Sequence, residues 1–363
     1  MRKAFGYLVL ITCITIYVVS WSPDLTKQFS AYKLSHTGIF SSDRYRYGDL
    51  YGMSNLPYFR KHYRQDDTIK YSNCNSKKKI DLYAVCDSYV WTLLTSNKFY
   101  CGVNKLTYIK TNDKEVLRSD LDTSKINILL LEFSERNVRY LLDDTGYANA
   151  LISKNRNDNN SIPVNQQGSS FTSGGSARTA IFNFIFNKNI NNNLQYNVWD
   201  FSFLTPVREL KSEIDYKLFG KVDKHVRMAA SGRQLYFTPT IDTNDIMSSF
   251  KYLSEQKKDK LINRLNTIYE NARQYGFNKI YLSIIPNPVS ILEPHYDGLD
   301  YNELVKRIQN DPQLKMPNID VTTEFERLKS KIYLASDSHW SAFGTTIWLN
   351  KLNAELEKIA IGH

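Results

Sequence analysis

The stretch Ile80-Asp-Leu-Tyr-Ala-Val-Cys86 decides the expected fold, because it is a short apolar run that leads directly into Asp87-Ser88-Tyr89. Such a run predicts a buried β-strand. A second string near the end of the chain has the same form, since Ile332-Tyr-Leu-Ala335 leads into Asp337-Ser-His339. Each string is expected to place polar side chains at the carboxyl end of a strand, where open α/β sheets hold their chemistry. The two strings together predict one site.

Other segments extend this pattern into an α/β fold. Apolar runs predict strands at 106–109, 126–132 and 279–285, and helical spacing predicts helices at 208–218, 254–275, 301–310 and 341–361. Alternating helices and buried strands indicate a mostly parallel sheet flanked by helices on both faces. We expect residues 76–363 to form this α/β domain, with an insertion at about 152–250, and residues 24–75 to form an irregular stalk.

The N-terminus predicts a membrane anchor over residues 1–23. Arg2 and Lys3 precede eighteen uncharged residues, Ala4 to Trp21, which suffice for a membrane span. The positive end in front predicts that the N-terminus stays in the cytoplasm while the rest of the chain is exported across the membrane. A cleaved signal peptide is the alternative, with Ser20-x-Ser22 as its cleavage site. The large residues Tyr17, Val18, Val19 and Trp21 around that site favour an uncleaved anchor.

Composition and charge are those of a globular protein, with 42% apolar and 23% charged residues among 363. The net charge is +10, but the basic residues are scattered and cluster only at 77–79 and 257–260. No nucleic-acid partner is therefore expected. Twenty-five Tyr and five Trp fit both carbohydrate binding and ordinary core packing.

The four cysteines indicate neither a disulfide framework nor a metal site. Cys13 lies in the apolar run, which leaves an odd number outside it: Cys74, Cys86 and Cys101. A single disulfide bond between Cys74 and Cys101 is compatible with this number of cysteines. With no CxxC pair and no His/Cys cluster, we expect no metal and no cofactor.

The two strings carry the residues of serine covalent catalysis. Ser88 is a poor nucleophile by itself and needs a base, which His339 supplies. Asp337 can accept the other ring N–H and fix the tautomer. The backbone N–H of Ser88 is the expected oxyanion donor. The competing interpretation is structural, with Ser88 as a helix cap and His339 as a capping histidine.

Four further residues are candidates for oxyanion or substrate binding. Arg136 and Asn287 follow neighbouring strands, so either can supply a second oxyanion donor or bind substrate. Tyr89 and Trp340 lie beside the reactive residues and can stack on sugar rings. The alternatives are a core position for Trp340 and a surface or ion-pair role for Arg136.

Asp-Ser after a strand, with a late Asp-x-His, resembles the layout of the SGNH (GDSL-type) hydrolase superfamily. Asp337-Ser-His-Trp-Ser-Ala-Phe-Gly344 is similar to the Asp-Thr-His-Trp-Asn-x-x-Gly string of the SGNH-like polysaccharide O-acetyltransferases of the alginate acetylation type. The segments 131–136 and 283–288 are similar to two others in that group. This chain departs from the superfamily in carrying Cys86 where the superfamily has Gly and in lacking a Gly-x-Asn block. It departs from the alginate proteins in placing Ser before Asp-x-His, which is the ordinary superfamily order.

The resemblance implies a three-layer, flavodoxin-like sheet and a function. It implies O-acetylation of a cell-surface or secreted polysaccharide through an acetyl-serine, with a membrane-bound O-acyltransferase as acetyl donor. Two alternatives remain: an esterase that removes acetyl groups with the same residues, and a non-catalytic glycan-binding or assembly protein with a vestigial site.

Overall fold

The computed structural model describes residues 2–63, 68–71, 79–111, 117, 120–143 and 190–361. They form two compact units. Unit 1 holds residues 2–63 and 190–223, and unit 2 holds the described residues from 68 to 143 and from 224 to 361. This division differs from the predicted one, because residues 190–223 group with the N-terminal helices while residues 224–250 group with the sheet.

Unit 2 is built on a four-stranded parallel sheet of order β2-β1-β3-β6. Its strands are β1 (Ile80–Cys86), β2 (Val103–Lys110), β3 (Ile126–Ser134) and β6 (Lys279–Ile285). Val85 lies opposite Leu131, and Ser134 lies opposite Ile285, so β1, β3 and β6 end at one edge. The predicted parallel sheet is therefore confirmed.

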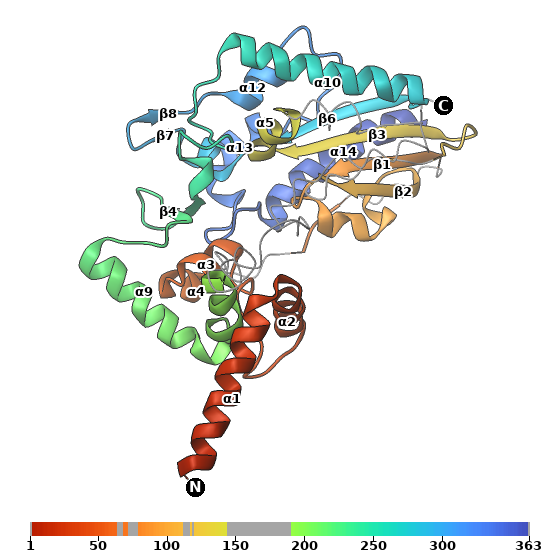
Figure 1. Ribbon diagram of the computed structural model, residues 1–363. Helices are drawn as coiled ribbons and strands as arrows, with labels where there is room; N and C mark the ends of the chain where they lie inside the picture. Colours follow the sequence, from red (N-terminus) through yellow and green to blue (C-terminus); the bar gives the residue numbers. More distant parts are fainter. Residues whose placement is uncertain are drawn as a thin grey trace, which may run out of the picture. The chain divides into compact units, whose positions relative to one another are not determined.

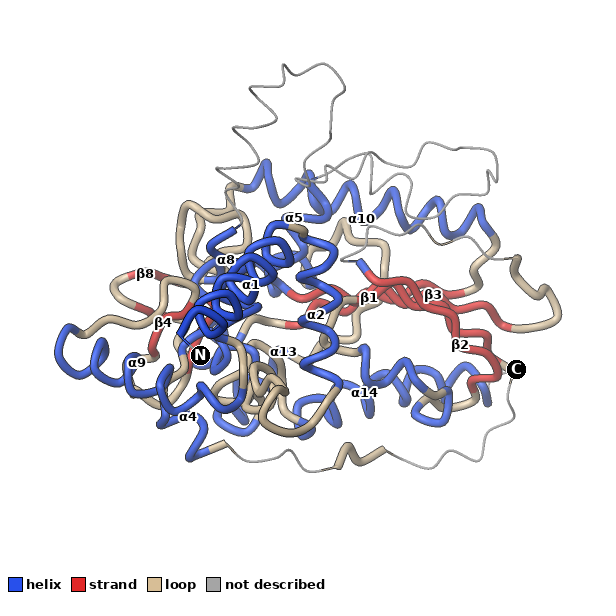
Figure 2. The backbone as a smooth tube through the Cα atoms, turned by 60° about the horizontal axis from the view of Figure 1, so that its bottom comes forward, coloured by secondary structure: helices blue, strands red, loops and turns tan. Residues whose placement is uncertain are grey.

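Helices cover both faces of this sheet (Figures 1 and 2). Leu82 and Ala84 of β1 share a core with α14 (Ala342–Ile361) and α13 (Thr322–Leu328). Tyr83 and Val85 of the same strand face the other core. That core includes residues of α5 (Glu135–Asp143), α10 (Glu255–Tyr275) and α12 (Leu304–Gln309). Burial on both faces explains why β1 is almost continuously apolar.

Local sequence signals set the ends of the long helix α10. The Ser254 side chain accepts a hydrogen bond from the backbone N–H of Lys257, and Gly276 ends the helix with a left-handed φ of 118°. The remaining elements of unit 2 are short. They are the 3₁₀ turns η1 (Trp91–Thr95), η2 (Asn97–Phe99), η6 (Thr238–Thr240) and η7 (Lys329–Lys331), the helix α11 (Pro288–Leu292), and the hairpins β4 (Val226–Met228) with β5 (Leu235–Phe237) and β7 (His295–Tyr296) with β8 (Leu299–Asp300).

The strand predicted at Ile332–Ala335 is wrong. This segment forms a loop with an isolated bridge between Tyr333 and Trp340, and the Ser341 N–H donates to the Ile332 carbonyl at 2.7 Å. The first turn of α14 packs so closely here that a Cβ at Gly344 would lie 2.8 Å from the Ile332 carbonyl oxygen. The apolar residues of this segment are therefore buried by packing against α14 rather than by pairing in the sheet.

Unit 1 is helical. It contains α1 (Arg2–Trp21), α2 (Pro23–Ser35), α3 (Asp49–Ser54), α4 (Pro57–His62), α8 (Ile190–Leu194), the π-helical turn η4 (Gln195–Trp199), the 3₁₀ turn η5 (Ser202–Leu204) and α9 (Thr205–Phe219). The prediction that residues 24–75 are irregular is thus wrong for much of 23–62. Ser22 caps α2 and Pro23 occupies its first position, which are ordinary helix-start signals.

Helix α1 is long and apolar enough to cross a membrane. Its window Lys3–Trp21 covers 19 residues, and most of its side chains are exposed. A length of 20 residues gives a helix of about 30 Å, the thickness of the hydrocarbon core. The structure thus agrees with the predicted anchor in length and composition.

Candidate active site

The turn after β1 is held by the buried carboxylate of Asp87. Asp87 accepts hydrogen bonds from the Ser134 N–H at 2.6 Å, from the Tyr89 N–H at 3.1 Å and from the Asn137 amide at 3.2 Å. The Asp87 N–H in turn donates to Glu132 at 3.0 Å. These bonds tie the end of β1 to the end of β3 and fix the position of Ser88 between them.

The structure brings Ser88, His339 and Asp337 together from segments 251 residues apart. The Ser88 Oγ lies 2.7 Å from His339 Nε2, and His339 Nδ1 lies 2.7 Å from Asp337 Oδ1. The His339 backbone N–H also donates to Asp337 Oδ1, at 2.9 Å. Because a carboxylate only accepts, Nδ1 carries the proton, and in a neutral ring Nε2 accepts from the Ser88 hydroxyl. This is the geometry of an activated serine.

Tyr89 and Trp340 fasten the loop of His339 to the turn of Ser88. The Tyr89 hydroxyl donates to the Ser338 carbonyl at 2.6 Å, and the Trp340 indole N–H donates to the Tyr89 carbonyl at 3.0 Å. Both rings are buried, at 3% and 5% exposure, and Trp340 packs against Phe325 and Trp348. Their burial favours a core role over the predicted role as a sugar platform.

Of the residues predicted to bind the oxyanion or the substrate, Ser88 and Arg136 lie at the turn after β1. The side chain of Asn287 forms its hydrogen bond away from this turn. Among the described residues, the Ser88 backbone N–H has no protein acceptor. The half-buried Arg136 guanidinium lies 5.5 Å from the centre of the Tyr89 ring. Asn287 is fully buried, and its amide donates to Ser249 at 2.9 Å, so its side chain supports the fold.

Asn137 is not among the predicted site residues, although its half-buried amide donates to Asp87 beside Ser88. An amide has two N–H donors, so one can hold Asp87 while the other serves as a second oxyanion donor. The signal was present in the run from Glu132 to Asn137, in which a buried strand ends in polar residues. It did not single out Asn137 from Arg136, its neighbour.

Two fully buried carboxyl groups, those of Glu132 and Glu135, bind the backbone around the site. Burial and the nearby charge of Asp87 raise the pKa of Glu132 well above its ordinary value. Burial also raises the pKa of Glu135, which accepts from the Asn287 N–H at 2.8 Å and from the Ser290 hydroxyl at 2.7 Å. Glu132 and Glu135 therefore connect the ends of β1, β3 and β6 through backbone hydrogen bonds.

Cys86 occupies the position before Asp87-Ser88, where the resembled superfamily has Gly. It is buried, and burial raises the pKa of its thiol. The residue behaves as a small apolar side chain and offers no reactive thiolate. Cys101 is disulfide-bonded, and Cys74 lies outside the described residues.

Comparisons with family models, with curated proteins and with solved structures find no match to this chain.

Proposed function

We propose that this protein is a membrane-anchored, extracytoplasmic acyltransferase that moves an acetyl group through Ser88 onto a hydroxyl group of a polysaccharide. The observation that carries the proposal is the hydrogen-bonded series from Ser88 through His339 to Asp337. The apolar helix α1 supports the location, with unit 2 on the periplasmic side of a bacterial envelope. The resemblance of 337–344 to the SGNH-like O-acetyltransferases supports the choice of acetyl and glycan.

The first half-reaction acetylates the serine. As the Ser88 Oγ attacks the acetyl carbonyl, its proton passes to His339 Nε2, and Asp337 stabilises the resulting imidazolium. The oxyanion accepts from the Ser88 N–H, and each such donor contributes about 3 kcal/mol to the transition state. His339 then protonates the leaving group as the carbonyl re-forms, which leaves acetyl-Ser88.

The second half-reaction reverses these roles. A glycan hydroxyl loses its proton to His339 Nε2 as it attacks the acetyl-serine, and collapse of the intermediate returns the proton to Ser88. An esterase would use water in the same step. The buried Tyr89 and Trp340 close one side of the site, which reduces the access of water to His339.

The test is intact-mass spectrometry of the purified chain after incubation with an activated acetyl ester. We expect one added acetyl group, mapped to Ser88, and none on Ser88→Ala or His339→Ala. Ser124→Ala is the matched control, since Ser124 is an exposed serine whose hydroxyl donates to Asp122. An adduct equally present on Ser88→Ala would remove the proposed nucleophile and favour the glycan-binding alternative.

Adding acceptor oligosaccharides distinguishes transfer from hydrolysis. We expect acetyl-Ser88 to decay faster with an acceptor present, and the acetyl group to appear on the sugar. Release of free acetate at an unchanged rate would identify an esterase.

A further inference from the structure

Helix α9 of unit 1 carries an apolar stripe that faces away from the protein. Val207, Leu210, Ile214 and Leu218 are exposed by 51%, 60%, 43% and 72%. At about 100° per residue these positions fall on one side of the helix. Glu209 on the opposite side is buried and accepts from the Tyr51 hydroxyl at 2.9 Å. The polar side of α9 therefore packs against the rest of unit 1, and the apolar side of α9 is exposed.

Lysines border the stripe on both sides. Lys211 and Lys217 flank it in helical projection, and their side chains are 77% and 67% exposed. Both pair with acidic residues four positions away. An apolar stripe bordered by long basic side chains is typical of a helix that lies in a membrane interface, since lysine can extend its charge to water above the acyl chains.

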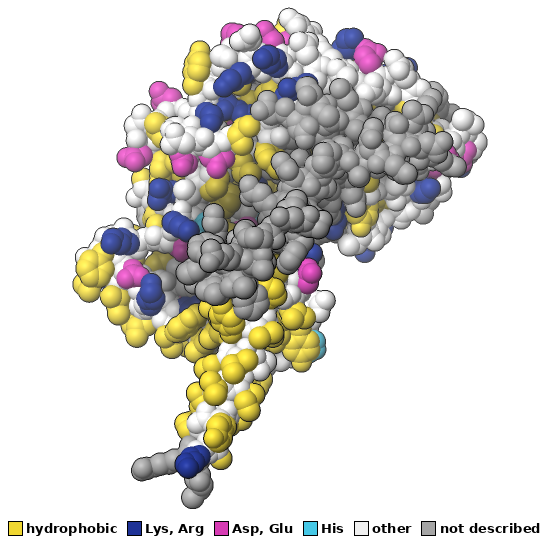
Figure 3. Space-filling view, in the orientation of Figure 1, with side chains coloured by type: hydrophobic (Ala, Val, Ile, Leu, Met, Phe, Trp, Pro, Cys, Tyr) yellow, Lys and Arg dark blue, Asp and Glu magenta, His cyan; other side chains and the backbone are white. Residues whose placement is uncertain are grey.

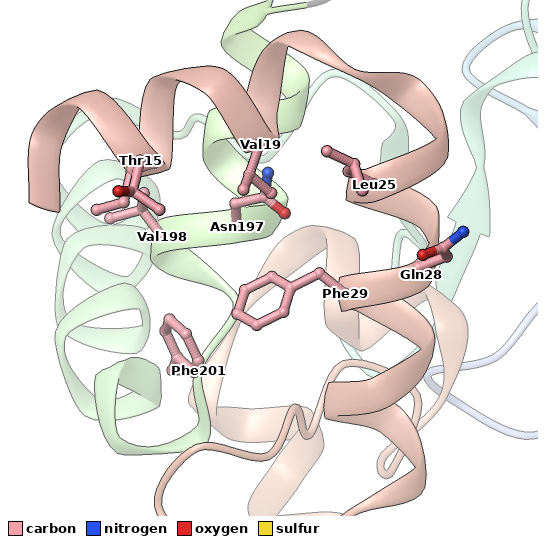
Figure 4. Close-up of a pocket in the computed structure, with 9 residues that line it drawn as sticks. Thr15, Val19, Leu25, Gln28, Phe29, Asn197, Val198 and Phe201 are labelled. Carbon is pink, nitrogen blue, oxygen red and sulfur yellow. The ribbon is translucent and has the colours of Figure 1, made fainter.

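The neighbours of α1 place unit 1 at the end of the membrane helix. Asn193 donates to the Ser20 carbonyl at 2.7 Å, and Asn197 donates to the Ser20 hydroxyl at 2.9 Å. An apolar groove of about 550 Å³ extends this contact toward Thr15 (Figure 4). It is lined by Thr15, Ile16, Val19, Leu25, Phe29 and Phe201, among others.

The length of α1 fixes the depth of these contacts. Nearly all of its 20 residues are needed to cross a hydrocarbon core of about 30 Å, so residues 15–20 lie near the outer surface of the bilayer. The segments that pack against them must then lie at that surface too. Within unit 1, α9 runs across the direction of α1, and apolar side chains continue from the border of unit 1 onto α1 (Figures 1 and 3).

We propose that unit 1 lies on the membrane surface, with the α9 stripe and the groove beside α1 in contact with lipid acyl chains. The occupant of the stripe is the bilayer that α1 crosses, since the stripe is continuous with α1 in side-chain character and lies in the same unit. The proposal rests on the membrane anchoring in the proposed function and is independent of its acyl-transfer chemistry.

The test is photocrosslinking in the full chain, reconstituted into vesicles of phosphatidylethanolamine and phosphatidylglycerol. Benzoylphenylalanine is placed singly at Leu210, Ile214 or Leu218, and phospholipid adducts are detected by mass spectrometry after illumination. Ser212 is the matched control because it lies on the inner side of the same helix, half-buried. Ile11 of α1, exposed by 61%, is the positive control.

We expect phospholipid adducts at Ile11 and at all three stripe positions, and none at Ser212. Adducts at Ile11 with none on the stripe would overturn the proposal. Crosslinks from the stripe to a second copy of the chain would also overturn it and would assign this face to a dimer. The absence of adducts at Ile11 would show that α1 does not cross the bilayer, and this result would also overturn the proposal.

Discussion

Both units bury carboxyl groups, but they stabilise them in different ways. At the sheet edge of unit 2, Glu132 and Glu135 accept from backbone N–H and hydroxyl groups, and burial raises the pKa of both. In unit 1, Asp43 pairs with Arg208 at 2.9 Å, and Glu209 pairs with Arg60 at 2.6 Å.

The difference separates positioning from stability. Hydrogen bonds from the backbone fix the turn of Ser88 and aim its hydroxyl at His339, whereas the ion pairs of unit 1 join segments that are distant in sequence. Changes at the sheet edge should therefore lower the reaction rate without unfolding the protein. Changes to the ion pairs should lower the free energy of unfolding without changing the reaction rate.

The largest effect is expected for Asp337→Asn. An amide in this place favours the wrong tautomer of His339, so the rate of acetyl-serine formation should fall about 10⁴-fold with the melting temperature nearly unchanged. The rate is measured by intact mass against time. The matched control is Asp300→Asn, because Asp300 also faces a histidine, His295, at 2.6 Å, but in an exposed pair.

An equal loss of rate in both variants would contradict the assignment of Asp337. A large fall in melting temperature in Asp337→Asn alone would give this residue a structural role.

The second effect is expected for Asp43→Ala in unit 1. This change leaves the largely buried Arg208 without its carboxylate partner and removes the acceptor of the Thr205 hydroxyl, so the free energy of unfolding should fall by about 3 kcal/mol. Denaturant unfolding of the full chain in detergent measures it. Asp43→Asn retains an acceptor and should lose less. A loss of rate at Ser88 without a loss of stability would contradict the separation of the two roles.

The third effect is expected for Asn137→Ala, which removes the amide beside Asp87. If this amide is the second oxyanion donor, kcat for acetyl transfer should fall about 10²-fold with little change in KM. If it only holds Asp87, the loss of one hydrogen bond should lower the free energy of unfolding by about 1 kcal/mol, with a smaller loss of rate. Measuring kcat, KM and stability on the same variant distinguishes the two roles.

Sequence reasoning succeeded where short-range signals determine the structure. The apolar run of β1 and the cap and stop residues of α10 predict those elements, and Ser88 follows β1 as expected. His339 lies 2.7 Å from Ser88, but no strand of the sheet precedes it. The wrong strand at Ile332–Ala335 shows the limit of this reasoning, since an apolar run can be buried by a helix as well as by a sheet.

The rest depended on contacts that no local pattern contains. The role of Asn287 follows from the register of β6 beside β3, which brings it to Glu135 across 152 residues. The order in residues 24–62 follows from unit 1, where the Thr205 hydroxyl reaches Asp43 across 162 residues. Such positions cannot be predicted from the periodicity of one segment.

The sharpest test of the two kinds of burial is the pH dependence of stability in Glu132→Gln. The pKa of Glu132 is raised in the folded state, so above the unfolded pKa of about 4.3 the folded chain holds a proton that the unfolded chain releases. Its contribution to stability is therefore greatest at low pH and is lost as the pH rises toward the folded pKa. For one such proton the slope is about 1.4 kcal/mol per pH unit.

Glu132→Gln imitates the protonated carboxyl and removes this slope. Denaturant unfolding of both chains between about pH 5 and pH 8 should show a smaller fall in the variant, with part of the fall remaining because the pKa of Glu135 is also raised. Glu209→Gln is the matched control for the loss of a buried glutamate, because it breaks the pair with Arg60, and it should lower the free energy of unfolding. An unchanged slope in Glu132→Gln would mean that Glu132 is ionised in the folded protein. The carboxyl group of Glu132 would then be a buried charge, like the carboxylates that pair with arginines in unit 1.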